Sequence, residues 1–264
     1  MSFKNQIVWI TGASSGIGEA MAVQFAREGA KVILSARRED QLNIVALECR
    51  KYCEDVAVLP LDLSETEKMG ELATKAASFF GPIDVLVNNG GISQRAMTWE
   101  STIDSIRTIM EVNFFGAVAL TKAVLPSMME RKKGYIVVTS SVMGKFGTKH
   151  RSTYAASKHA LHGWFDCLRQ EMYDYNVDVT LVCPGYIKTE ITVNAITGDG
   201  SKFNKMGDAH VNAMTTEEFS KKLLPALSKR KPEVYIGGKE IYAVYLKRFF
   251  PNLLNKVLRN AKVT

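Results

Sequence analysis

The stretch Ile7-Val8-Trp9-Ile10-Thr11-Gly12-Ala13-Ser14-Ser15-Gly16-Ile17-Gly18 decides the fold of this chain. Its apolar beginning predicts a strand over Ile7–Ile10, and a helical pattern starts near residue 16. The glycines between them allow the backbone to turn tightly and to approach a phosphate closely. Because a helix N-terminus offers unpaired N–H groups and the positive end of a dipole, we expect a dinucleotide to bind here. A tight strand-to-helix turn without a ligand is the alternative interpretation.

Short apolar runs rich in Val and Ile alternate with longer helical patterns along the chain. The predicted strands cover residues 7–10, 31–35, 56–59, 85–88, 135–139, 177–182 and 234–236. The predicted helices cover roughly residues 16–28, 39–53, 66–80, 101–130, 153–175 and 216–229. Strands that are apolar throughout are typical of a parallel sheet between helices. We therefore expect an α/β fold: a single Rossmann-type domain over residues 1–264, with a doubly wound parallel sheet of about seven strands and helices on both faces.

The composition is that of an ordinary globular protein, with 46% hydrophobic and 23% charged residues in a chain of 264. We expect a cytoplasmic protein, because no apolar run reaches the ~20 residues of a membrane span and no signal-peptide pattern precedes the first strand. The four cysteines have neither metal-ligand spacing nor the density of a disulfide framework, so we expect no metal. The net charge of +7 comes without a nucleic-acid-binding motif, which argues against nucleic acid as a partner.

Two segments interrupt the alternation. Residues 189–215 form a predicted substrate lid, because they lack a strong strand pattern and carry scattered apolar side chains: Ile191, Val193, Ile196, Phe203, Met206 and Met214. Residues 239–264 form a basic amphipathic C-terminal tail, in which Leu253, Leu254, Val257 and Leu258 alternate with Lys247, Arg248, Lys256, Arg259 and Lys262. The tail either makes peripheral contact with a membrane or packs on a neighbouring subunit or on its own domain, and we favour packing.

The end of the second predicted strand indicates which dinucleotide binds. An acidic side chain at this position bonds the adenosine ribose hydroxyls and selects NAD. This chain has Ala36 there, followed by Arg37 and Arg38. A guanidinium suits a 2′-phosphate by its charge and by its fork of donors. The sequence therefore predicts NADP(H) in preference to NAD(H), chiefly through Arg37.

Tyr154 and Lys158 lie four residues apart, and therefore on one face of a predicted helix. A phenol normally titrates near pH ~10, and a fixed ammonium beside it lowers the phenol pKa by favouring the phenolate. The pair is therefore a candidate general acid/base. By itself this pattern is weak, since an ordinary surface contact has the same spacing.

Further motifs occur in order before and after this pair. They are Asp62 in Leu61-Asp62-Leu63, Asn88-Asn89-Gly90-Gly91, Asn113 in Val112-Asn113-Phe114, Ser141, and Pro184-Gly185-Tyr186-Ile187-Lys188-Thr189. Ser141 precedes Tyr154 by thirteen residues. Together with Thr11–Gly18 and the Tyr–Lys pair, these motifs resemble those of the short-chain dehydrogenase/reductase family over about residues 5–190. Gly90 stands where that family usually has Ala.

The resemblance implies an oxidoreductase that interconverts a carbonyl and an alcohol by hydride transfer. Tyr154 would exchange a proton with the substrate oxygen, and Ser141 would hold the same oxygen in line. Lys158 would lower the Tyr154 pKa and grip the nicotinamide ribose, and Asn113 would hold a water that links Lys158 to solvent. Ser140 is the alternative to Ser141, and a helix–helix hydrogen bond is the alternative role for Asn113.

The resemblance also implies which residues contact the cofactor. Asp62 would contact the adenine, while Ile187 and Thr189 would bind the nicotinamide carboxamide. The full set of expected contacts is Gly12, Ser14, Ser15, Gly16, Ile17, Gly18, Arg37, Arg38, Asp62, Leu63, Asn89, Gly90, Tyr154, Lys158, Pro184, Gly185, Ile187 and Thr189. His159 and His162 lie close to Tyr154 and Lys158 in the predicted helix 153–175, and we expect both histidines to face solvent or a dimer partner.

The lid and the tail make the chain similar to the steroid and retinoid dehydrogenase-like branch of the family. With the adaptable apolar side chains of the lid, they indicate a small, moderately apolar ketone, aldehyde or alcohol as substrate. A 3-oxoacyl-carrier-protein reductase is one alternative, with Arg95 and Lys145 as candidates for its basic docking patch. A non-catalytic dinucleotide sensor is another. Because the family usually forms dimers or tetramers through the helices that here cover 101–130 and 153–175, we expect a homo-oligomer.

Overall fold

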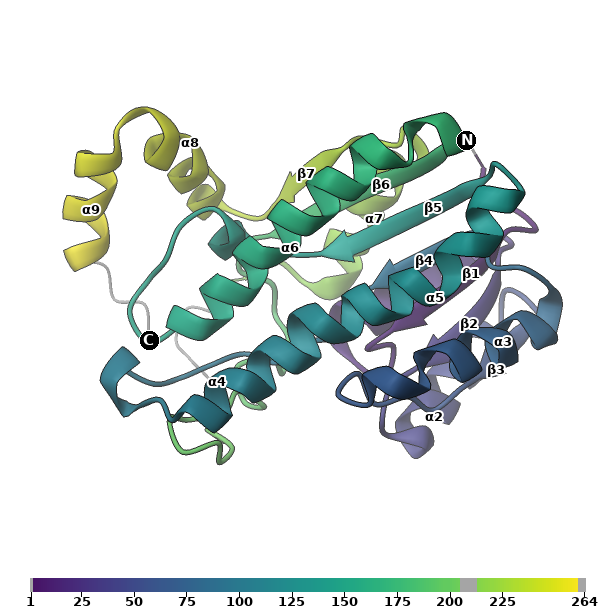
Figure 1. The fold of residues 1–264 in the computed structure, drawn as a ribbon, viewed down its shortest axis with the longest axis horizontal. Coiled ribbons are helices and arrows are strands. Elements are labelled where there is room, and N and C mark those ends of the chain that lie inside the picture. Colours follow the sequence, from purple (N-terminus) through teal and green to yellow (C-terminus); the bar gives the residue numbers. More distant parts are fainter. Residues whose placement is uncertain (1, 205–212, 261–264) are drawn as a thin grey trace.

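The fold is a single twisted sheet between two layers of helices, and the computed structural model describes it for residues 2–204 and 213–260 (Figure 1). Seven strands lie parallel in the order β3-β2-β1-β4-β5-β6-β7. They are β1 (Ile7–Thr11), β2 (Lys31–Ser35), β3 (Val56–Val58), β4 (Val85–Asn88), β5 (Gly134–Thr139), β6 (Val177–Pro184) and β7 (Glu233–Ile236). The predicted doubly wound α/β sheet is confirmed. The strand order reverses between β1 and β4, where sheets of this kind bind ligands.

The helices pack an apolar stripe against each face of the sheet. They are α1 (Gly16–Arg27), α2 (Glu39–Cys49), α3 (Met69–Phe80), α4 (Ile103–Met110), α5 (Gly116–Glu130), α6 (Ser152–Glu171), α7 (Thr216–Ser228), α8 (Tyr242–Phe249) and α9 (Pro251–Asn260). On one face α1, α2 and α7 bury Phe25, Leu42 and Leu223. On the other face α3, α5 and α6 bury further apolar side chains, among them Leu120 and Phe165. Each such side chain contributes about 1.5–3 kcal/mol when fully buried.

Helices α4 and α5 form one continuous rod, joined by the π-helical turn η3 (Glu111–Phe115). Contrary to the sequence expectation, Ile103–Glu130 is long and apolar enough to cross a membrane by length and composition, with a mean hydropathy of 1.4. In this fold the apolar residues Leu120, Val124 and Met128 pack against the sheet instead. The core therefore accounts for part of this hydropathy, since 39% of the apolar window in Ile103–Glu130 is buried.

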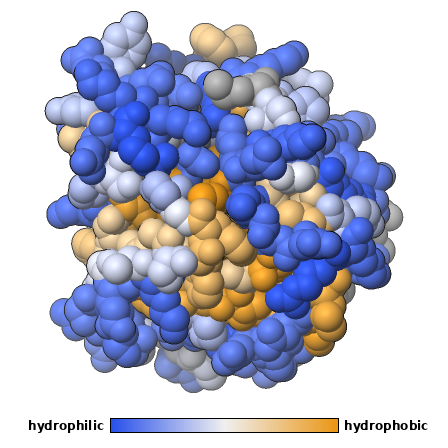
Figure 2. All heavy atoms as spheres, turned by 90° about the vertical axis from the view of Figure 1, so that its right-hand side faces the viewer, coloured by the Kyte–Doolittle hydropathy of each residue, from blue (hydrophilic) through white to orange (hydrophobic). Residues whose placement is uncertain are grey.

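The carboxyl ends of the strands point toward the side of the molecule that carries the lid and the tail (Figure 1). The described part of the lid attaches there through isolated bridges that pair Gln94 with Ile196 and Ile187 with Met214. Met206 lies outside the described residues. Figure 2 shows the opposite side, where hydrophilic side chains surround an apolar area.

The tail folds as α8 and α9, and it packs partly on its own domain. Leu254 is buried in a small cluster with Val142 and Phe146, while Leu253 and Val257 are each 50% exposed. The apolar face that the sequence predicts is therefore divided between the domain and the surface. Lys262 lies outside the described residues.

The turn between β1 and α1 depends on glycine at positions where a side chain does not fit. Gly12 has φ +64°, and a Cβ atom on it would lie 2.8 Å from the Gly90 Cα. A Cβ atom on Gly18 would collide with the Gly12 carbonyl oxygen and lie 2.5 Å from the Asn89 Nδ2. Because the Gly12 carbonyl is backbone of the turn itself, the collision cannot be relieved by rotating a side chain.

We expect Gly18→Ala to lower the free energy of unfolding by about 1–3 kcal/mol, the usual cost of overpacking. Gly70→Ala is the matched control, since no atom lies within 4 Å of a Cβ placed there, and it should leave stability within about 0.5 kcal/mol of wild type. Urea unfolding of the three proteins measures both values. Equal losses in the two variants would contradict this account of the turn.

Candidate active site

A cleft of about 580 Å³ opens at the carboxyl ends of the strands. It is bordered by every residue of the predicted cofactor set except Gly18, and by the predicted catalytic residues Ser141, Tyr154 and Lys158. Asn113 lies behind the wall of the cleft and does not border it. The residues named from motifs far apart in the chain therefore converge on one cavity.

The end of β1 is tied to the end of β4 at the floor of this cleft. The Thr11 hydroxyl accepts hydrogen bonds from the backbone N–H groups of Asn89 and Gly90, both at 3.0 Å. The Asn89 amide donates to the Thr11 carbonyl oxygen at 3.1 Å. Gly90 fits its surroundings, because a Cβ atom there would lie 2.5 Å from the Leu63 Cδ1. Asn89 and Gly90 therefore fix the shape of the glycine-rich turn.

Charged side chains gather at the outer end of the cleft, next to β2 and β3. Arg37 is 70% exposed, and its Nη1 lies 4.0 Å from the Asp62 Oδ2. Arg38 donates from Nη2 to the Ser14 hydroxyl at 3.4 Å. Asp62 also accepts a hydrogen bond from the Ser64 N–H at 2.9 Å. An anionic group at this end would therefore meet two guanidinium groups.

Ser141, Tyr154 and Lys158 form the inner end of the cleft. The Ser141 hydroxyl lies close enough to the Tyr154 phenol to lower its pKa, and its oxygen accepts from the Met143 N–H at 3.1 Å. The Lys158 Nζ donates to the Thr139 carbonyl oxygen at 2.8 Å and lies 5.7 Å from the centre of the Tyr154 ring. Ser140 instead donates to the Lys158 carbonyl oxygen at 3.3 Å. The geometry thus favours Ser141 over Ser140 as the partner of Tyr154.

The electrostatics of this group differ from the sequence expectation. Burial raises the pKa of Tyr154 above its ordinary value, and the Arg151 charge and the Ser141 hydroxyl oppose this only in part. Burial also lowers the pKa of Lys158 to about 8. The expected lowering of the Tyr154 pKa by Lys158 is therefore wrong for this structure, because desolvation outweighs the neighbouring charges.

Asn113 occupies the π-helical turn η3, a form of helix that is frequent at functional sites. Its Oδ1 accepts from the Ile92 N–H at 2.7 Å, and its Nδ2 donates to the Ile92 carbonyl oxygen at 2.9 Å. The same Nδ2 lies 3.0 Å from the Ser157 hydroxyl on α6. Asn113 thus joins the segment after β4 to the helix that carries Tyr154. This contact resembles the helix–helix hydrogen bond that was the alternative role for Asn113.

Three residues at this site were not predicted from the sequence. Gln94 is fully buried, and its Oε1 accepts from the N–H groups of Thr153 at 2.8 Å and Tyr154 at 3.4 Å, so it caps the start of α6. Glu240 accepts from the Tyr186 N–H at 2.7 Å, beside Gly185. Arg151 borders the cleft immediately before α6. Of the three, only Arg151 had a signal in the sequence, namely its closeness to Tyr154. The contacts of Gln94 and Glu240 join residues more than 50 positions apart.

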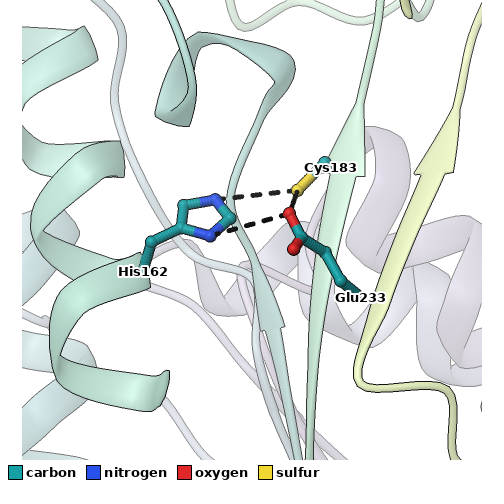
Figure 3. A group of neighbouring side chains, drawn as sticks. All are labelled: His162, Cys183 and Glu233. Atoms are coloured by element: carbon teal, nitrogen blue, oxygen red, sulfur yellow. Dashed lines mark hydrogen bonds and ion pairs between the residues drawn. The ribbon is translucent and has the colours of Figure 1, made fainter. Parts of the chain in front are cut away.

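His162 corrects a further expectation, because it is buried instead of facing solvent or a partner. Its Nε2 lies 3.7 Å from the Cys183 Sγ, and its Nδ1 lies 3.8 Å from the Glu233 Oε1 (Figure 3). These are metal-binding residue types, but the imidazole presents a different nitrogen to each neighbour, and Lys145 already pairs with the same carboxylate oxygen at 2.9 Å. Burial lowers the pKa of His162 to about 4. The group is best described as an uncharged imidazole that lies beside the Lys145–Glu233 ion pair, with its Nδ1 buried and without a hydrogen-bond partner. His159 is exposed as expected.

Comparisons with known proteins agree with this geometry. Residues 6–199 match the family model for short chain dehydrogenases. The chain is 44% identical over 248 residues to a dehydrogenase/reductase SDR family protein 7-like protein of Anopheles gambiae, covering 92% of this chain and 78% of that protein. It is 40% identical over 260 residues to a Drosophila melanogaster protein of the same description, covering 95% and 80%.

The fold has a solved counterpart as well. A short chain dehydrogenase/reductase from Burkholderia phymatum, crystallised in complex with NAD, superposes with a TM-score of 0.85 at 22% identity and covers 96% of each chain. At that identity the likeness concerns the fold alone. The family model, however, spans more than half of the chain, and the two insect relatives align along most of its length. This chain therefore belongs to the short-chain dehydrogenase/reductase family.

Proposed function

We propose that this protein is an NADP(H)-dependent oxidoreductase that interconverts a carbonyl and an alcohol on a small, moderately apolar substrate, with Tyr154 as general acid/base. Membership of the family supports an oxidoreductase that acts on CH–OH groups with a nicotinamide dinucleotide. The observation that carries the finer proposal is the convergence of Ser141, Tyr154 and Lys158 in one cleft with the glycine-rich turn.

The cofactor supplies the hydride, and the side chains of this chain manage the proton and the substrate oxygen. Since burial keeps the pKa of Tyr154 above its ordinary value, the phenol holds its proton at neutral pH and is ready to donate it to a carbonyl oxygen. Ser141, next to the phenol, orients the same oxygen. These features support Tyr154 as the group that donates the proton when a carbonyl is reduced.

Lys158 and Asn113 have supporting roles in this proposal. Lys158 lies behind the phenol and is anchored on the Thr139 carbonyl oxygen, from where its remaining N–H bonds would reach the nicotinamide ribose. Asn113 holds the Ile92 backbone and Ser157, and its Oδ1 and the Lys158 Nζ both lie near Gly91. We propose that a water held there returns the proton that Tyr154 gives up.

The cofactor residues are proposed on the same basis. Gly12, Ser14, Ser15, Gly16 and Ile17 would surround the pyrophosphate, and Gly18 would let α1 approach the turn. The adenosine end would meet Arg37, Arg38, Asp62, Leu63, Asn89 and Gly90, and the nicotinamide end Pro184, Gly185, Ile187 and Thr189. The exposed guanidinium of Arg37 beside Asp62 supports NADP(H).

Two rival functions are less well supported. A carrier-protein reductase would need an exposed basic patch, but Arg95 is buried and Lys145 is paired with Glu233. A dinucleotide sensor would have no need of the Tyr154 and Lys158 pair. The apolar lid residues Ile191 and Ile196, which border the cleft, support a moderately apolar substrate of the kind used by the steroid and retinoid dehydrogenase-like branch.

We further propose a homodimer or homotetramer built on the outer faces of α5 and α6, as is usual in the family. We propose a cytoplasmic location. The burial of Leu254 supports packing of the tail, and the exposed Leu253 and Val257 leave peripheral membrane contact as the competing arrangement.

Tyr154→Phe tests the acid/base assignment, because it removes the proton and keeps the ring. We expect kcat/KM for NADPH-dependent reduction across a panel of ketones and aldehydes to fall by about 100-fold or more, with little change in the Kd of NADPH. Tyr173→Phe is the matched control, since Tyr173 is 84% exposed and does not border the cleft. Unchanged turnover in Tyr154→Phe would rule the assignment out, and a panel without any turnover would favour the sensor.

Arg37→Gln tests the cofactor preference. Wild type should bind NADPH more tightly than NADH, and the variant should lose about tenfold in NADPH affinity while its NADH affinity stays within a factor of about two, because only NADPH carries the 2′-phosphate. Fluorescence titration gives the four dissociation constants. Equal or tighter binding of NADH by wild type is the result that would reject NADP(H) as the preferred cofactor.

Lys158→Met tests the burial of the ammonium through the pH dependence of stability. The pKa of Lys158 is about 8 in the fold and 10.5 in the unfolded reference, so between these values the unfolded chain binds the additional proton and stability rises with pH. Between pH 8 and pH 10.5, the free energy of unfolding of wild type should rise by about 3 kcal/mol relative to that of the variant. Denaturant unfolding along this pH series measures the difference, and a constant difference would contradict a buried, neutralisable lysine.

A further inference from the structure

Arg151 carries a buried positive charge that the proposed mechanism does not use. Its side chain is 7% exposed, yet it borders the cleft that holds Tyr154. Its Nη1 donates to the Ser93 hydroxyl at 2.6 Å, while its Nε is buried without a hydrogen-bond partner. Within residues 2–204 and 213–260, no carboxylate pairs with this guanidinium, and the only neighbours that favour its charge are the phenols of Tyr154 and Tyr186.

Such an arrangement is costly for the folded protein. An ion taken out of water without a counter-charge loses several kcal/mol of hydration free energy, and arginine cannot escape this by losing its proton. The position adds to the cost, because Arg151 stands at the N-cap of α6, where the helix dipole is already positive. The Gln94 carboxamide that caps this helix supplies hydrogen bonds and no negative charge. An uncompensated cation of this kind, placed in a cleft, indicates an anionic ligand.

The position of the guanidinium relative to the acid/base group defines where that anion would lie. The Arg151 Cζ is 5.8 Å from the centre of the Tyr154 ring, and both residues border the same end of the cleft. A substrate whose carbonyl oxygen meets the phenol would therefore place a group that is only a few bonds away beside Arg151. The fork of N–H donors fits the paired oxygens of a carboxylate or a phosphate.

We propose that Arg151 is a specificity residue that binds an oxyanion, a carboxylate or a phosphate monoester, carried by the substrate close to its reacting carbonyl. The proposal rests on the proposed function, since it takes Tyr154 as the group that meets the carbonyl. It narrows the substrate class to carbonyl compounds that combine an apolar part with a short anionic arm.

The test compares matched compounds that differ only in the anionic group. They are 4-oxopentanoate and 3-oxobutanoate with their methyl esters, and hydroxyacetone phosphate with hydroxyacetone. Wild type should favour the anionic member of at least one pair, and the preferred pair distinguishes carboxylate from phosphate. In Arg151→Met the KM of that anion should rise by about 10- to 100-fold, as expected for a lost charge-assisted hydrogen bond, while the KM of its neutral counterpart changes by less than about threefold.

Arg151→Lys and Arg107→Met complete the set of variants. Arg151→Lys keeps the charge without the fork and should recover part of the affinity for the anion. Arg107→Met removes one exposed charge on α4 and serves as the matched control, because the Arg107 side chain is 76% exposed and borders no part of the cleft. If Arg151 served only to lower the Tyr154 pKa, Arg151→Met would shift the pH profile of reduction for acid and ester alike.

Equilibrium binding separates this proposal from the proposed function. The same compounds are titrated into the protein with NADP⁺ present, so that no turnover occurs, and Kd is read from intrinsic fluorescence. An anion preference that disappears in Arg151→Met would support the proposal even if every carbonyl in the panel fails as a substrate. Equal Kd values within every pair, or an anion preference that survives in Arg151→Met, would overturn it.

Discussion

The hydrogen bonds of the Thr11 hydroxyl hold together the point at which the strand order reverses. This hydroxyl accepts from the Asn89 and Gly90 N–H groups and lies 3.3 Å from the Val87 carbonyl oxygen, so one side chain at the end of β1 fixes the end of β4. The reversal sends the connections after β1 and after β4 to opposite faces of the sheet, which leaves a crevice between them. The residues that border the candidate site lie around that crevice.

The inner end of the crevice contains buried charged side chains, which destabilise the folded protein. Lys158 and Arg151 are both buried on or next to the first two turns of α6, and burial lowers the pKa of each. Neither has a carboxylate partner among the described residues. Destabilising charged groups of this kind are concentrated at sites that bind ligands or catalyse reactions. The local instability is offset by the apolar clusters on both faces of the sheet, in which the rest of α6 takes part through Phe165.

The fold and most of the site were predictable because their signals are local. The strands are short runs of Val and Ile, the turn is one glycine-rich stretch, and the Tyr154 and Lys158 spacing follows from one helical turn. The interior of the site was harder, because burial and pairing depend on contacts between distant segments. No local pattern shows that Gln94 caps α6, that His162 faces Cys183 and Glu233, or that the Tyr154 pKa rises. The sequence predicted most of the residues that border the cleft, whereas their burial and their electrostatic environment required the structure.

The tail is connected to the site more closely than its composition indicates. Leu254 packs with Val142, the residue directly after Ser141, and Lys149 donates to the Arg259 carbonyl oxygen at 3.1 Å. At the head of the tail, Glu240 holds the Tyr186 N–H, in the segment between Gly185 and Ile187 that borders the cleft. The tail therefore contacts both the segment next to Ser141 and the segment Gly185–Ile187 at the border of the cleft. Because closely packed elements transmit small displacements, a displacement of α9 would also bear on Val142, which directly follows Ser141.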